Sequence, residues 1–172
     1  MNNTRIAKII FTFLFIAAII LPLFFVDQLP DRVASHFDLN NQADGWMSKR
    51  GYMFFHYGIV IFFYLTFWGL SILIPKFPAS LINLPQKDYW LHESRKENTF
   101  IILQAMILWI GNLCLALFVY VFYEILKANT SGTEKISGFS WVSIIIFLFG
   151  TMIVIIKYIN RFTKKESQLE EQ

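Results

Sequence analysis

The sequence contains little charge and almost no cysteine. Asp, Glu, Lys and Arg make up only 16% of its 172 residues, and the formal net charge is +3. A few basic residues beside apolar segments do not make the basic stripe of a nucleic-acid surface, so we expect no nucleic-acid partner. The single cysteine, Cys114, excludes an intramolecular disulfide and lies in an apolar run, where packing is its expected role. No cofactor is expected.

Long apolar runs account for most of the chain. Hydrophobic residues make up 56% of it and the mean hydropathy is +0.51, which is outside the usual range of soluble domains. Four runs stand out, at 9–26, 51–74, 100–126 and 139–156. A helix needs about 20 apolar residues to cross a bilayer, where its backbone must be hydrogen-bonded internally. The sequence therefore predicts an all-α membrane protein in which one domain, 1–172, forms a bundle of four transmembrane helices in the lipid bilayer.

The basic residues are distributed unevenly between the predicted loops. Lys and Arg resist translocation, so they concentrate on the cytoplasmic side of a membrane. The amino terminus, the second loop (75–99) and the carboxyl tail hold ten of the 15, namely Arg5, Lys8, Lys76, Lys87, Arg95, Lys96, Lys157, Arg161, Lys164 and Lys165. This distribution predicts a multi-pass protein of the cell membrane, with both termini cytoplasmic and the first loop (27–50) outside.

The first loop contains several turn-forming residues. Pro30 redirects the chain after the first helix, and Asn40–Asn41 and Asp44–Gly45 are typical of turns because Asn, Asp and Gly tolerate left-handed torsions. Trp46 and Lys49 indicate an interfacial anchor at the start of the second helix. Much of this loop therefore has a structural explanation.

His36 and Asp38 are not explained by turn formation alone. If residues 33–40 are extended, side chains alternate and these two share one face. His56 and Glu124 lie near the outer ends of the second and third helices, so all four side chains could converge in an outward-facing polar site. Such a site could bind a metal or sense pH. The alternative is that His56 and Glu124 are solvated at the headgroup level while His36 completes a turn.

The second loop and the helix interiors carry a smaller set of signals. Tyr89 and Trp90 are typical of an interfacial dock, and Ser94 with Glu97 fits a capping box that would start the third helix near Arg95. Polar groups at depth are expected to hydrogen-bond between helices, and glycines to allow close helix approach. The residues concerned are Gln104, Asn112, Gly58, Gly69, Gly111 and Gly150.

Two segments resemble a known family. LPDRVASHFDLNNQADGW followed by Ser48–Lys49, and NLPQKDYWLHESRKE, are similar to the two motifs of a bacterial membrane family of unknown function. That family's domain also forms the amino-terminal part of immunity proteins against the sporulation-delay toxin, a secreted peptide. Ala34–Ser35 replaces the proline that relatives often have before the histidine, whereas Asn41 can preserve their turn. The matching positions are Pro30, His36, Phe37, Asp44, Trp46, Ser48 and Lys49 in the first loop, and Asn83, Leu84, Pro85, Tyr89, Trp90, Leu91, Glu93 and Arg95 in the second.

The resemblance implies a non-enzymatic protein that recognises an extracellular peptide in immunity or signalling. A membrane or regulatory protein is a further candidate partner. The candidate ligand-binding residues are His36, Phe37, Asp38, Asp44, Trp46, Lys49, His56 and Glu124. A small transporter, or a subunit of one, is an alternative in which Gln104, Asn112, His56 and Glu124 form a polar path. A metal-dependent enzyme is the third, with His36, Asp38 and His56 as ligands and Glu124 as the base.

Overall fold

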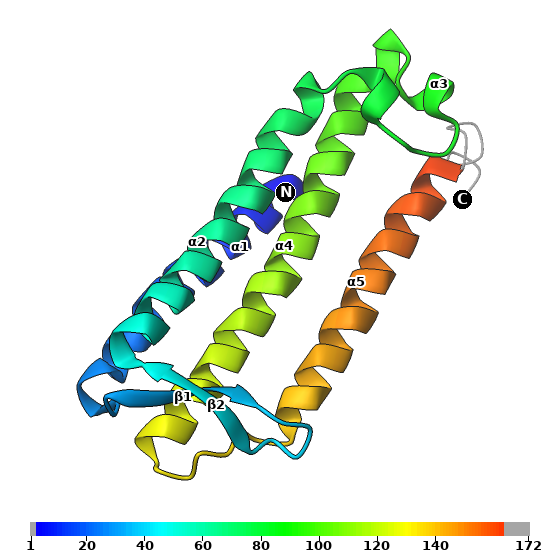
Figure 1. Cartoon of the computed structure of the whole chain (residues 1–172). Coiled ribbons are helices and arrows are strands. Elements are labelled where there is room, and N and C mark those ends of the chain that lie inside the picture. Colours follow the sequence, from blue (N-terminus) through cyan, green and yellow to red (C-terminus); the bar gives the residue numbers. More distant parts are fainter. Residues whose placement is uncertain (1–2, 164–172) are drawn as a thin grey trace.

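Four long helices dominate the computed structural model, which describes residues 3–163 (Figure 1). They are α1 (Asn3–Ile20), α2 (Lys49–Leu73), α4 (Glu93–Thr130) and α5 (Phe139–Thr163). Each is long and apolar enough to cross a membrane, so the prediction of four such helices is confirmed. Helices α4 and α5 extend beyond the predicted apolar runs by polar turns, whereas α1 ends at Ile20 and the rest of its run forms short 3₁₀ turns.

Helix α4 is the centre of the packing, since α1, α2 and α5 all pack against it. Gly111 lies where the first two of these approach it. A Cβ atom built on Gly111 would lie 2.8 Å from Cε2 of Phe11 in α1 and 2.9 Å from Cβ of Phe67 in α2. Close helix approach is thus confirmed at Gly111, whereas nothing lies within 4 Å of the same position on Gly58.

Asn112, the next residue of α4, hydrogen-bonds between helices as expected. Its Nδ2 donates to the carbonyl oxygen of Ala7 in α1 at 3.1 Å. The surrounding core is almost entirely apolar and includes Phe11, Leu108 and Leu115. In contrast, large side chains of α5 such as Ile146 and Ile153 are exposed, as lipid-facing side chains are.

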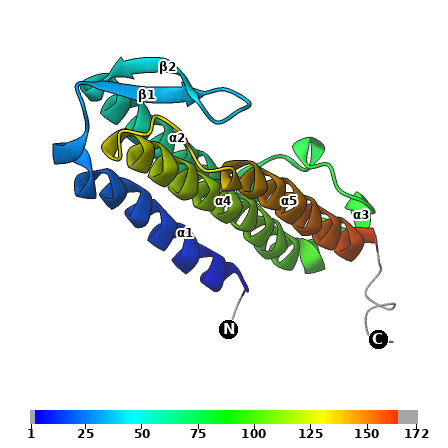
Figure 2. The same cartoon turned by 90° about the horizontal axis from the view of Figure 1, so that it is seen from below.

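The first loop folds as a β-hairpin across one end of the helices, which corrects the all-α prediction (Figure 2). Strand β1 (Arg32–Phe37) pairs antiparallel with β2 (Ala43–Ser48). Val33, Phe37 and Met47 pack on the core below, and the exposure of successive side chains alternates along β2, as is typical of a strand with one face covered. Asn41 takes the left-handed turn position with φ 64°, as predicted.

The second loop lies at the opposite end, beside the last turn of α5 (Figure 1). It contains two short 3₁₀ turns and the one-turn helix α3 (Lys87–Trp90). Helix α4 then begins at Glu93, and its N-cap is His92, whose Nδ1 accepts from the backbone N–H of Ser94 at 3.4 Å. The predicted Ser94 capping box is therefore wrong, because an imidazole nitrogen takes the capping position two residues earlier.

Candidate functional site

The hairpin is attached to α4 through the side chain of Asn129. Its Oδ1 accepts from the backbone N–H of Ala34 at 2.7 Å, and its Nδ2 donates to the carbonyl of Ala34 at 2.9 Å. Nδ2 also donates to the carbonyl of Ile125 at 2.8 Å. The side-chain amide of Asn129 thereby satisfies both backbone groups of Ala34, as a further paired strand would. Ala34 and Asn129 are both buried. Nothing in the sequence near β1 indicated this residue.

Two further connections position the hairpin. The Lys49 backbone N–H donates to the carbonyl of Asp31 at 2.8 Å, and its Nζ donates to the carbonyl of Leu29 at 3.2 Å. Ser48 caps α2 by accepting from the N–H of Gly51 at 3.1 Å. Ser48 and Lys49 therefore join β2 to the start of α2, so the motif they belong to has a structural role.

The hairpin turn is tied to the loop between α4 and α5. The Ala43 N–H donates to the carbonyl of Glu134 at 3.0 Å, and the Ile136 N–H donates to that of Asn41 at 3.1 Å. A cavity of about 410 Å³ adjoins this junction and is lined by charged side chains that include Glu124, Lys127 and Lys135. The hairpin, the connecting loop and this cavity together form what we call the hairpin platform.

His36 pairs with Asp44 across the two strands of the platform. Nδ1 of His36 contacts Oδ1 of Asp44, and the two side chains are 74% and 46% exposed. They meet at a pair of register irregularities that leave Ser35 and Asp44 without a directly opposite residue. Gly45 is required there, because a Cβ atom on it would lie 2.9 Å from Cβ of His36. Asp44–Gly45 therefore belongs to β2, and the predicted turn at this position is wrong.

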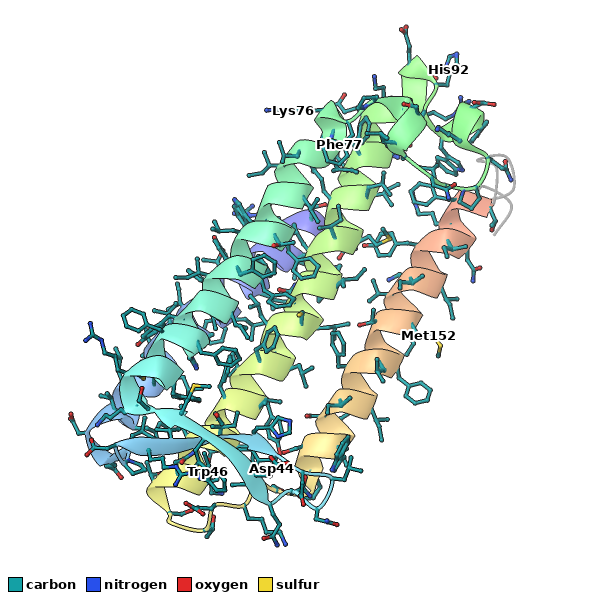
Figure 3. The ribbon with its side chains drawn as sticks, viewed as in Figure 1. Asp44, Trp46, Lys76, Phe77, His92 and Met152 are labelled. Atoms are coloured by element: carbon teal, nitrogen blue, oxygen red, sulfur yellow. The ribbon has the colours of Figure 1, made fainter. Side chains whose placement is uncertain are left out.

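A second exposed pair lies further along the same strands. The guanidinium of Arg32 lies 4.7 Å from the centre of the Trp46 ring, within the range of a cation–π interaction. Trp46 is partly exposed, and Leu39 in the turn is 81% exposed. Figure 3 shows Asp44 and Trp46 together at this end of the molecule, far from His92 and Lys76. Phe37, by contrast, packs into the core below.

Asp38 organises the hairpin turn. Its Oδ1 accepts from the backbone N–H groups of Asn40 at 2.8 Å and Gln42 at 2.9 Å. The hydrogen bond from the Gln42 backbone, followed by those from Asn40, lowers the pKa of the Asp38 carboxyl group below its usual value. Asp38 therefore has a structural function in the turn and does not share a site with His36.

His56 and Glu124 also have separate partners, so the four predicted side chains do not converge. His56 is fully buried, with Nε2 bonded to the carbonyl oxygen of Ala18 at 2.9 Å and its ring against that of Phe122. Glu124 accepts from the N–H of Ser137 at 2.9 Å. Within residues 3–163, no three His, Cys, Asp or Glu side chains are placed to hold a metal ion.

The second-loop motif docks the end of α5. Nε1 of Trp90 donates to the carbonyl of Phe162 at 2.8 Å, and the hydroxyl of Thr99 donates to the carbonyl of Trp90 at 2.7 Å. The guanidinium of Arg95 lies 4.1 Å from the centre of the Tyr89 ring. Leu84 and Trp90 are buried in the same apolar cluster. This motif therefore holds α4 and α5 together at the end opposite the hairpin platform.

Residues 13–61 match one protein-family model, a domain of unknown function, DUF1648. The match spans the last part of α1, from residue 13 on, the whole hairpin and the first half of α2, so it includes the His36–Asp44 pair and the Ser48–Lys49 junction. No curated protein and no solved structure matches the chain. This finding is consistent with the resemblance to a family of unknown function: the chain contains a DUF1648 domain at residues 13–61, and the second-loop motif lies outside the match.

Proposed function

We propose that this is a non-enzymatic bacterial membrane protein that binds an extracellular peptide at the hairpin platform, in immunity to a toxic peptide or in signalling. The observation that carries the proposal is the exposure of two pairs, His36–Asp44 and Arg32–Trp46, on a hairpin fixed to the helices. Binding residues commonly lie on irregular segments positioned by a rigid scaffold. Such a platform offers charge, aromatic surface and a preformed shape.

The distribution of basic residues supports this proposal. Positive residues are in excess at the end that carries the second loop, so we propose that this end faces the cytoplasm. The hairpin platform then faces the outside, where a secreted peptide arrives. The resemblance to the domain found in toxin-immunity proteins favours protection over other kinds of binding.

The arrangement favours binding over transport or metal catalysis. His56 and Asn112 each use a side-chain nitrogen to bond a carbonyl of α1, which ties two members of the suggested polar path into helix packing. His36 and Asp38, two of the suggested metal ligands, are bonded to Asp44 and to the turn backbone. Within residues 3–163, no three His, Cys, Asp or Glu side chains lie where they could hold a metal ion together.

The test is survival of bacteria that lack the gene and carry it again on a plasmid. Cells are challenged with a panel of antimicrobial peptides secreted by related bacteria, and His36→Ala/Asp44→Asn is compared with the wild type. The matched control is His92→Gln/Asp88→Asn, which alters the same residue types at the opposite end. We expect protection to be lost only in the platform variant, at equal membrane abundance. Survival that is independent of the gene, or equal for the two variants, contradicts the proposal.

A further inference from the structure

Two adjoining cavities lie at the end of the molecule opposite the hairpin platform. The larger, of about 370 Å³, is enclosed by the first turn of α1, one side of α4 and the last turns of α5. The smaller, of about 290 Å³, continues along α1 and shares Thr4 and Ile101 with the first. We call them together the α1–α5 cavity. Its residues lie outside the DUF1648 match.

The α1–α5 cavity is strongly positive. Lys157 and Arg161 of α5 line the larger part, and Arg5 and Lys8 of α1 line the smaller. Neither lining set contains a carboxylate, and none of these four cations forms an ion pair with a carboxylate within residues 3–163. Like charges that share one space repel each other unless an anion joins them. The arrangement therefore provides the counter-charge for an anion.

Neutral polar groups complete the lining. Asn3 is held across two helices, because its Oδ1 accepts from Nε1 of Trp109 at 2.9 Å and its Nδ2 donates to the hydroxyl of Tyr158 at 3.2 Å. The Tyr158 hydroxyl oxygen thus accepts from Asn3. The hydroxyl hydrogen can then donate to a ligand in the cavity that Tyr158 lines. Asn98 of α4 adds an amide. An oxyanion with several acceptor oxygens, such as a phosphate, fits this set, and an arginine fork matches it well.

An apolar surface leads away from the cavity along α5. Ile153 and Ile156, in the turn before Lys157, are exposed at 62% and 47%. These side chains face the space that lipid occupies around a spanning helix, whereas Lys157 and Arg161 lie at its end. A ligand with a phosphate and acyl chains would therefore contact both surfaces at once. Basic pockets between helix ends bind anionic lipid headgroups in this way.

We propose that the α1–α5 cavity binds the phosphate headgroup of an anionic phospholipid, with its acyl chains along α5. The bound lipid would bridge the ends of α1 and α5, which both reach the cavity from opposite ends of the chain. The α1–α5 cavity is separate from the hairpin platform, so the lipid proposal does not depend on the function proposed for the platform.

Native mass spectrometry of the full chain in detergent tests the proposal. Phosphatidylglycerol and phosphatidylcholine are titrated separately against the wild type and against Lys157→Gln/Arg161→Gln. The matched control is Lys76→Gln/Lys96→Gln, which removes the same charge from surfaces at the same end, outside the cavity. Because each basic group near a lipid surface contributes about 1 kcal/mol, we expect phosphatidylglycerol affinity to fall on the order of tenfold or more in the cavity variant only.

Two further measurements complete the test. One shows whether the bound phosphate belongs to a lipid or to a soluble compound, and the other controls for misfolding of the variants. Glycerol phosphate and inorganic phosphate are added as competitors: if either binds as tightly as phosphatidylglycerol, the ligand is a soluble phosphate and the lipid proposal is wrong. The variant Lys157→Arg/Arg161→Lys keeps the charge and should retain binding. Equal affinity for the two lipids, or an equal loss in the cavity and control variants, overturns the proposal.

Discussion

Asn129 makes three hydrogen bonds with one side-chain amide, two to Ala34 in β1 and one to Ile125 in its own helix. In Asn129→Ala the buried N–H and C=O of Ala34 lose their partners, and each unsatisfied buried group costs about 1–3 kcal/mol. For the two groups together we therefore expect a loss of roughly 2–6 kcal/mol in the free energy of unfolding. A denaturant titration in micelles measures it.

The control for this change is Asn160→Ala, an exposed asparagine in α5. Its side chain is at the surface, so we expect the free energy of unfolding to change by less than about 0.5 kcal/mol. Equal effects of the two substitutions would mean that the Asn129 amide does not hold the hairpin to α4.

Gly111 provides a second test at the scale of one residue. A methyl group there meets Phe11 and Phe67 at less than 3 Å, so Gly111→Ala must push α1 or α2 away from α4. Overpacking of this kind costs typically about 1–3 kcal/mol. Gly58→Ala is the matched control, since its methyl group meets nothing within 4 Å. We expect unfolding in the same titration to be easier for Gly111→Ala alone, and comparable stability of the two variants would contradict the packing described.

At the scale of the element, the hairpin turn depends on ionised Asp38. Its carboxylate has a pKa below the usual 3.8, mainly because the Gln42 N–H donates to it. A lowered pKa means that the turn is fully stabilised above the usual value and loses that stabilisation as the pH falls through the lower, folded-state value. We expect the amide NMR signals of Asn40 and Gln42 to move together over that acid range. In Asp38→Asn the acceptor remains without its charge, so the same signals should not titrate with it.

The hairpin also shows what sequence patterns can and cannot predict. The extended segment expected at 33–40 is a strand only as far as Phe37, since Asp38 already belongs to the turn. Asn41 was correctly placed in a left-handed turn. Asp44–Gly45 has the composition of a turn, yet it lies in β2, because Gly45 is selected by the close approach of His36. Asn129 is 95 residues away from Ala34, so no local pattern could reveal their contact.

At the scale of the whole molecule, hydrophobic length alone predicted the four long helices, because the requirement to satisfy the backbone in lipid leaves few alternatives. It could not predict how polar residues pair. His56, Asp38 and Glu124 were expected in one site, because ionisable groups in or near spanning helices are costly to bury and are therefore functional candidates. Each instead has a nearby backbone partner, and that choice depends on helix packing that a single sequence does not specify.

The orientation in the membrane gives the last prediction. Among the described residues, most of the basic side chains that flank the spans lie at the end of the second loop. Lys164 and Lys165, which the sequence assigns to the same side, are outside the described residues. We therefore expect a cysteine at Leu39, in the hairpin turn, to react with a membrane-impermeant maleimide in intact cells. A cysteine at the exposed Lys96, at the opposite end, should react only after the cells are permeabilised.

Both substitutions are made in a Cys114→Ala background, since the native thiol is the only cysteine and is buried. Labelling of both sites after permeabilisation is the internal control for folding and access. If Lys96→Cys reacts in intact cells and Leu39→Cys does not, the hairpin platform faces the cytoplasm. A secreted peptide could then not reach it, and the platform would have to bind an intracellular partner instead.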